Sequence, residues 1–288
     1  ATKVARSSTL SPSSAAAILP LMGHSSHEVK ARKRGPLTVS GSDGRVTLMR
    51  LVVVVLALLL AAFPAPAQSS IEEARALIVN YHEDVTRLDR ARDLVEQFLK
   101  TDSRVEGMIL LSRICFMWGD VRAKDEEEKL AAYDRGREVG KRAVELAPRN
   151  PEAHFWYAVN TGRWGTTKGV LRSLFLLPTL REEVEIILML APNDPGALGL
   201  AGNIELALPW GDLDKADANF RKGLKVDPHY TAVRLDLARL LIKRGKYDEA
   251  RRELRRVLNE KEPRFLSDWT VKHTKRAREL LDAIKDKS

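Results

Sequence analysis

The stretch ADANFRKGLKVDP, residues 216–228, decides the fold of this chain. It places Ala216, Phe220 and Gly223 at offsets of four and then three residues, and it ends at Pro228. Small and apolar residues at this spacing lie on one face of a helix. Proline cannot continue a helix, because it lacks the backbone N–H and its ring clashes with the preceding turn. The stretch therefore predicts a helix that packs closely on a partner helix and then ends.

The same arrangement recurs along the chain. Further copies are GREVGKRAVELAP (136–148), ARRELRRVLNEKEP (250–263) and a degenerate copy, ARDLVEQFLKTDS (91–103). Four prolines end such units or mark their period, at spacings of 44, 36 and 35 residues: Pro148, Pro192, Pro228 and Pro263. This pattern is typical of the second helix of a tetratricopeptide repeat, a unit of roughly 34 residues.

The first helix of each unit is predicted from the residues that follow each proline. Small residues, Ala158, Gly202 and Ala238, stand ten positions after three of the prolines, where the two helices of a unit pack closest. We therefore predict an all-α, tetratricopeptide-like helical-repeat solenoid of about five helix pairs. A C-terminal capping helix within residues 268–284 would close it. A non-repeating helical bundle is the alternative.

The N-terminal part of the chain is unlike the repeats. Residues 49–67, MRLVVVVLALLLAAFPAPA, have the basic start, apolar run and small-residue end of a secretory signal peptide. A membrane anchor is the alternative, but the apolar run is shorter than the roughly 20 residues that span a bilayer. Residues 1–48 read as a disordered leader or an upstream extension. We expect residues 68–288 to form a single, periplasmic domain.

The net charge of +9 is concentrated in the leader. Residues 1–48 carry +5 and Arg50 adds one, so residues 68–288 keep only +3. This balance gives no reason to expect a nucleic-acid partner. The single cysteine, Cys115, has no partner in the chain for a disulfide and is predicted to be a small buried apolar residue.

The 44-residue spacing contains about ten residues beyond a standard repeat. They lie between Gly165 and Pro178 and are mostly apolar, so the solenoid or another chain must cover them. The predicted contact residues are Val170, Leu171, Leu174 and Phe175. We place Trp156, Asn160 and Arg163 on a helix face directed toward this insertion. The predicted ligand or partner groove consists of Phe155, Trp156, Asn160, Arg163, Trp164 and Lys168.

Several spaced motifs resemble one known family. The stretches WYAVNTGRWG, LPTLREEVE, GLAGNIELALPWGDLDKADANFRKGLKVDPHYT and DWTVKHTKRARELL occur in the order seen in the T-component of tripartite ATP-independent periplasmic (TRAP) transporters. The resemblance covers roughly residues 85–285. It implies a periplasmic helical protein that associates with a solute-binding subunit, can self-associate, and has apolar clefts for a small organic ligand. The lipoprotein cysteine of some members is missing here.

The sequence shows no constellation typical of an enzyme. The six histidines are scattered, and GRWGTTKG lacks the Gly-Lys-Ser/Thr ending of a phosphate loop. We expect Glu182, Glu183 and Glu185 to be helix-surface charges and the segment 120–128 to be a solvated linker. We therefore predict no catalytic residues, no metal and no cofactor. The leading hypothesis is a scaffold or adaptor for a protein partner. A small-ligand binding protein and a general envelope-assembly scaffold are the alternatives, and a homo-oligomer stays open.

Overall fold

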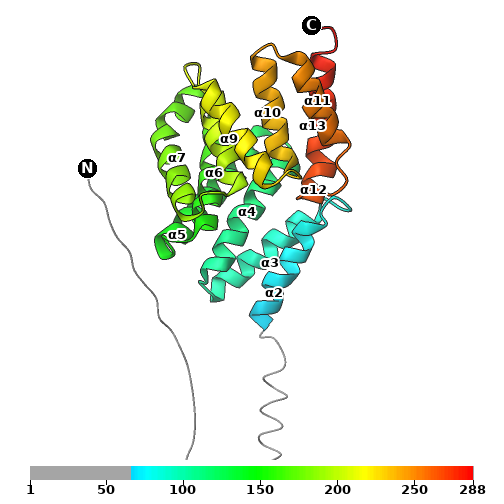
Figure 1. Cartoon of the computed structure of the whole chain (residues 1–288). Helices are drawn as coiled ribbons and strands as arrows, with labels where there is room; N and C mark the ends of the chain where they lie inside the picture. Colours follow the sequence, from blue (N-terminus) through cyan, green and yellow to red (C-terminus); the bar gives the residue numbers. More distant parts are fainter. Residues whose placement is uncertain (1–65, 288) are drawn as a thin grey trace, which may run out of the picture. The chain divides into compact units, whose positions relative to one another are not determined.

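The helix starts follow from capping residues in the sequence. The Asn150 side chain accepts hydrogen bonds from two backbone N–H groups, and Pro151 occupies the first helical turn. Asp194 and Pro195 start a later helix in the same way. In both cases an Asn or Asp side chain followed by proline sets the first residue of the helix. The computed structural model describes residues 66–287, shown in Figure 1. The predicted leader, and the predicted signal peptide up to residue 65, lie outside the described residues.

Residues 66–287 form five successive helix pairs and a closing segment, as predicted. The pairs are α2 (Pro66–Val79) with α3 (Arg87–Thr101), α4 (Val105–Val121) with α5 (Glu126–Leu146), α6 (Pro151–Lys168) with α7 (Val170–Leu190), α8 (Pro195–Ala207) with α9 (Leu213–Val226), and α10 (Thr231–Lys243) with α11 (Tyr247–Leu258). The closing segment consists of α12 (Leu266–Asp268), a π-helical turn η1 (Trp269–His273) and α13 (Thr274–Ala283). Among these described helices, none is both long and apolar enough to cross a bilayer.

Small residues let the two helices of a pair approach each other. A Cβ atom added to Gly202 in α8 would lie 2.5 Å from the ring of Phe220 in α9. Ala158 and Ala238, at the equivalent positions of α6 and α10, are buried. Cys115 is also buried, as predicted, and burial raises the pKa of its thiol to about 12. The close-contact positions predicted from spacing are therefore confirmed.

The apolar insertion lengthens one helix pair and forms no loop. α6 has 18 residues and α7 has 21, whereas α8 has 13 and α9 has 14. Pro178 lies inside α7, and α7 starts after Gly169, whose φ of 107° favours glycine. The first half of α7 is mostly apolar, and its apolar side chains lie both toward the neighbouring helices and on the exposed side.

The closing segment does more than cap the last pair. Ala277 and Ile284 are buried against the last repeats, so this segment closes the solenoid as predicted. However, α12 also lies against α2 and the turn that follows it (Figure 1). The Tyr81 hydroxyl donates to Asp268 Oδ1 at 2.7 Å, and Ser267 Oγ donates to the Val79 carbonyl. The C-terminal segment therefore joins the last repeat to the first.

Two glycines give a matched test of this packing. We expect Gly202→Ala to lower the free energy of unfolding by about 1–3 kcal/mol, because its Cβ would overlap the buried Phe220 ring. A Cβ on Gly162 in α6 would meet only Leu180 Cδ2 and Cδ1, at 3.7 and 3.9 Å. Gly162→Ala should therefore raise the free energy of unfolding by up to about 1 kcal/mol through helix propensity. Urea denaturation of both variants measures the difference, and equal effects would contradict the packing described.

Candidate functional site

A cleft of about 820 Å³ lies between α6, α7, α8, α10 and the closing segment. Most of its wall is apolar. Leu174, Leu177 and Leu180 line it from α7, and Phe155 and Val159 line it from α6. The cleft thus lies beside the lengthened helix pair.

Four glycines line the cleft, and one of them borders open space. Gly162 and Gly165 line it from α6, and Gly196 and Gly199 line it from α8. An added Cβ at Gly162 would have only ordinary van der Waals contact with Leu180, so this part of the wall borders open space. A Cβ added at Gly165, Gly196 or Gly199 would instead meet the side chain of Leu176, Phe155 or Val233 at 2.9, 2.7 and 3.0 Å, so these three glycines allow close packing at the cleft wall.

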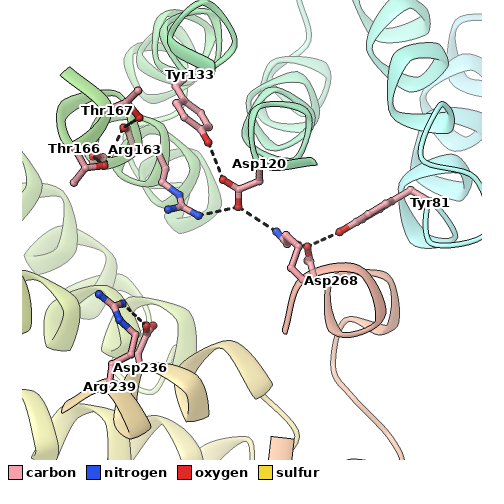
Figure 2. A network of polar contacts seen from close by, with 11 residues as sticks. Tyr81, Asp120, Tyr133, Arg163, Thr166, Thr167, Asp236, Arg239 and Asp268 are labelled. Carbon is pink, nitrogen blue, oxygen red and sulfur yellow. Dashed lines mark hydrogen bonds and ion pairs between the residues drawn. The ribbon is translucent and has the colours of Figure 1, made fainter. Parts of the chain in front are cut away.

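One end of the cleft is polar and is centred on Asp120, at the end of α4. Its Oδ2 atom accepts from Arg163 at 2.8 Å and from Lys272 Nζ at 3.2 Å. Its Oδ1 atom accepts from the Tyr133 hydroxyl at 2.8 Å. Lys272 Nζ also lies 2.6 Å from Asp268 Oδ1. Figure 2 shows the resulting chain of contacts from Tyr133 to Tyr81, with side chains from separate parts of the chain. We call this set the closing network.

The closing network is a balanced set of charges. Burial alone would raise the pKa of Asp120, but the Arg163 and Lys272 cations outweigh it and hold that pKa below its ordinary value. Burial acts in the same direction on Asp268, and Lys272 likewise brings its pKa below the ordinary value. Burial lowers the pKa of Lys272, yet the two carboxylates raise it by more. At neutral pH two cations therefore face two carboxylates, which is how buried charges are tolerated.

A second polar group lies at the same end of the cleft. Asp236 of α10 accepts from Arg239 at 2.9 Å and from Asn203 at 2.6 Å. Figure 2 places Asp236 and Arg239 apart from Asp120, on a different helix. Burial raises the pKa of Asp236, and Arg239 lowers it by less. Four cationic side chains line the cleft against two acidic ones: Arg163, Arg239, Lys272 and Arg276 against Asp120 and Asp236.

The structure brings part of the predicted groove into this cleft. Phe155, Arg163, Val170 and Leu174 line it. Leu171 and Phe175 point away, with exposed fractions of 76% and 78%.

The other predicted groove residues lie elsewhere. Asn160 is fully buried and donates to the Ser112 carbonyl at 2.9 Å, so it serves packing against α4. Trp156 packs on Phe116 of α4, with ring centroids 5.8 Å apart. Trp164 lies under the guanidinium groups of two arginines on α5 and α7, and Lys168 is exposed. The predicted orientation of Trp156 and Asn160 toward the insertion is wrong, because that side of α6 faces α4.

Two expectations about charged residues are also corrected. Asp120 is not part of a solvated linker, because its side chain is only 9% exposed and it holds the closing network together. Glu183 is not a surface charge. Its Oε2 atom lies 2.5 Å from Nδ1 of the buried His154, and burial raises its pKa. His154 Nε2 lies 2.9 Å from the Pro148 carbonyl oxygen, so it must donate there.

The polar residues of the cleft are largely absent from the sequence prediction. Only Arg163 was identified; Asp120, Asp236, Arg239 and Lys272 were not. The one available signal is the position of Asp236 in LDLARLL, a charge within an otherwise apolar helix. Such a residue is rarely buried without a partner.

Comparison with known proteins agrees with this architecture. A family model for tetratricopeptide repeats matches residues 211–265. A solved structure, a thermophilic tetratricopeptide protein of Thermus thermophilus, covers 73% of this chain and 98% of its own, with a TM-score of 0.57 and 19% identity. The chain is a tetratricopeptide-like helical-repeat protein. At this identity the structural match concerns the fold alone.

The tetratricopeptide-like protein also has curated relatives. A family model described as regulator of microtubule dynamics protein 1-3 matches residues 70–207. Regulator of microtubule dynamics protein 2 of Mus musculus is 24% identical over 192 residues, which is 59% of this chain and 47% of the relative. The Macaca fascicularis protein of the same name is 30% identical over 98 residues, 31% of this chain and 24% of the relative. The chain therefore spans less than half of the length of these relatives.

Proposed function

We propose that the protein is a helical-repeat adaptor that holds an apolar, acidic segment of a protein partner in the cleft. Helical repeats commonly present an extended binding surface to proteins. The observation that carries the proposal is the cleft itself, which combines an apolar wall with four cationic side chains. An apolar segment would displace water from the wall, and a carboxylate would meet Arg163 or Arg239. A guanidinium group has donors left after one ion pair.

The identity of the partner is a narrower part of the proposal. The resemblance to the TRAP transporter T-component, with the predicted signal peptide, favours a periplasmic solute-binding subunit. The matched family model and the relatives are instead named as regulators of microtubule dynamics, which favours a microtubule component. These two partners belong to different compartments. The experiment below separates them, and a general envelope-assembly partner would be a third result.

A second candidate function uses the same cleft for a small organic anion. Its volume of about 820 Å³ lies within the range of small-molecule sites. Apolar walls with a few convergent polar groups are typical of such sites. In this case the cleft would bind the small organic anion, and no protein partner would occupy it.

Photocrosslinking from within the cleft tests the adaptor function. A photoreactive residue at Val159 lies in the cleft wall, whereas one at the exposed Lys141 of α5 does not. We expect crosslinks to one defined protein from position 159 and none from position 141. Gly162→Leu places a side chain in the open part of the cleft. It should reduce crosslinking by about tenfold or more, the loss expected for about 1.4 kcal/mol of binding free energy.

The identity of the crosslinked protein then decides among the partners. A solute-binding subunit would support the transporter adaptor, and tubulin would support the function named for the relatives. Native mass spectrometry of the uncrosslinked protein tests the second candidate function, the binding of a small organic anion. If the unmodified protein carries a bound small molecule that Gly162→Leu lacks, and no protein is crosslinked, the function would be ligand binding and the adaptor function would be wrong.

A further inference from the structure

Arg113 of α4 is a cation without an anionic partner in the part of the chain that the structure describes. Within residues 66–287 its guanidinium takes part in no salt bridge, and its Nε atom is buried with no hydrogen-bond acceptor. The side chain is partly buried, and this burial lowers its pKa below the ordinary value. Buried charges are normally paired, because removing an unpaired charge from water is costly. The charge of Arg113 is therefore unbalanced at short range.

Two aromatic rings from other parts of the chain hold this guanidinium in place. It lies over the Trp156 ring of α6 and over the Phe265 ring that precedes α12, 5.5 Å from each centroid. The Phe265 ring packs in turn on Tyr230, with ring centroids 5.6 Å apart. A ring attracts a cation through its face, whereas the N–H groups of a guanidinium lie in its own plane. The terminal N–H groups of Arg113 therefore remain available to an acceptor from outside the chain.

The position of Arg113 is next to the cleft but outside it. Arg113, Phe116 and Asp120 are spaced by three and then four residues, so they share one face of α4. Phe116 and Asp120 line the cleft, and Arg113 does not. Seven residues of α-helix separate Arg113 from Asp120 by about 10 Å along the axis. A ligand held by Arg113 would therefore occupy a position of its own.

The charges around Arg113 indicate which ligand it can hold. Besides burial, Asp268 of the closing segment and Glu152 of α6 raise its pKa, and Arg75 of α2 lowers it. Asp268 is bound to Lys272. Glu152 is exposed and forms no salt bridge with any residue of the described range 66–287. Two nearby carboxylates oppose a second negative charge on a ligand, so a dianion such as phosphate is disfavoured relative to a monoanion.

We propose that Arg113 is a carboxylate-binding site, at which a monocarboxylate accepts two parallel hydrogen bonds from the terminal nitrogens of the guanidinium. The flanking rings of Trp156 and Phe265 limit the access of water, which strengthens an ion pair there. A free organic acid and an acidic group of a bound protein present the same carboxylate, so both can supply it. The site lies outside the cleft and does not depend on the proposed function.

Titration with sodium acetate, against sodium chloride at equal ionic strength, tests the site in the full chain. Proton–nitrogen correlation NMR follows the arginine Nε–H and tryptophan Nε1–H signals, and Arg113→Lys and Trp156→Phe assign the two signals that belong to the site. We expect acetate to shift both signals saturably. Arg252 of α11 is exposed and has no salt bridge among the described residues, so its signal should not saturate.

Three substitutions distinguish binding at Arg113 from a general effect of charge. Arg113→Lys keeps the charge but loses the parallel donors, and should raise the acetate dissociation constant, read from the Trp156 signal, by about tenfold. Glu152→Gln removes a nearby negative charge and should lower this constant by about threefold. Glu185→Gln makes the same change on the exposed side of α7 and should leave it unchanged. Circular dichroism checks that each variant folds.

Two further probes identify what carries the carboxylate. A saturable shift with N-acetyl-triglycine, but not with its C-terminal amide, would support a carboxylate carried on a protein chain. Binding of acetate without binding of N-acetyl-triglycine would support a free organic acid. The proposal is overturned if acetate gives no saturable shift, or if Arg113→Lys binds acetate as tightly as the unmodified protein. Inorganic phosphate that binds as tightly as acetate would overturn the choice of a monocarboxylate.

Discussion

Replacing Lys272 by methionine is expected to lower the free energy of unfolding by about 3–5 kcal/mol, the cost of leaving buried charges unpaired. Lys272 Nζ lies 2.6 Å from Asp268 Oδ1 and 3.2 Å from Asp120 Oδ2. Methionine keeps most of the side-chain volume but removes the cation. Arg163 would then remain to balance two carboxylates in the closing network. Urea denaturation followed by the helical circular dichroism signal measures the loss.

Two further variants show whether the effect is electrostatic. Lys275→Met makes the same change on the exposed side of α13 and should alter stability by no more than about 0.5 kcal/mol. Adding Asp268→Asn to Lys272→Met removes one of the unpaired charges and should restore part of the stability. A loss below about 1 kcal/mol for Lys272→Met would mean that the closing network holds no buried ion pair of consequence.

Stability should also fall by about 3 kcal/mol as the pH drops from about 6.5 to 4, because of His273 alone. Burial lowers the pKa of His273 to about 4, against an ordinary value of 6.5. Between these values the unfolded chain binds a proton that the folded chain does not. The free energy of unfolding therefore decreases as the pH is lowered through this window. Asp268 and Asp120 raise this pKa and Lys272 lowers it, but burial is the larger effect.

The difference in the free energy of unfolding between the unmodified protein and His273→Asn, measured at each pH, separates the contribution of His273 from the titration of other groups. Asparagine retains a partner for the Thr231 hydroxyl, which lies 2.8 Å from His273 Nδ1. The variant should lose less stability than the unmodified protein between pH 6.5 and 4. His229 is a control of opposite sign, because its hydrogen bond with Glu260 raises its pKa. If the free energy of unfolding depends on pH in the same way for the unmodified protein and for His273→Asn, His273 is solvated in the folded protein.

The fold could be predicted from the sequence because its signals are local and repeated. Pro148 and Pro228 end units, and small residues such as Gly202 recur at fixed distances from them. Each signal acts over a few residues, where helix geometry dictates which side chains meet. The aromatic residue Phe155 and the cation Arg163 could likewise be assigned to a groove from their positions in the repeat.

The polar end of the cleft could not be predicted in this way. Asp120 and Lys272 are 152 residues apart, and neither belongs to a periodic pattern. Their contact depends on the rotation from each helix pair to the next, summed over the five pairs. The sequence of a single repeat does not indicate that sum. The face of Asn160 could not be assigned for a related reason, because its contacts lie in the preceding helix pair, with Ser112 of α4 and Gly136 of α5, and the spacing within one repeat does not specify them. The resemblance to the TRAP transporter T-component also exceeds what the matched family models support, since these describe tetratricopeptide repeats and regulators of microtubule dynamics.

The hydrogen bond between Tyr81 and Asp268 has a consequence for how the chain folds. An open solenoid has only contacts between neighbouring repeats, so its repeats can form and fray one at a time. Here two residues separated by 187 positions must meet. Closing so long a loop costs entropy before any contact compensates it, which raises contact order and slows folding. The first and last repeats then protect each other from local opening, so amide hydrogens near both ends of the solenoid should exchange as a single cooperative unit.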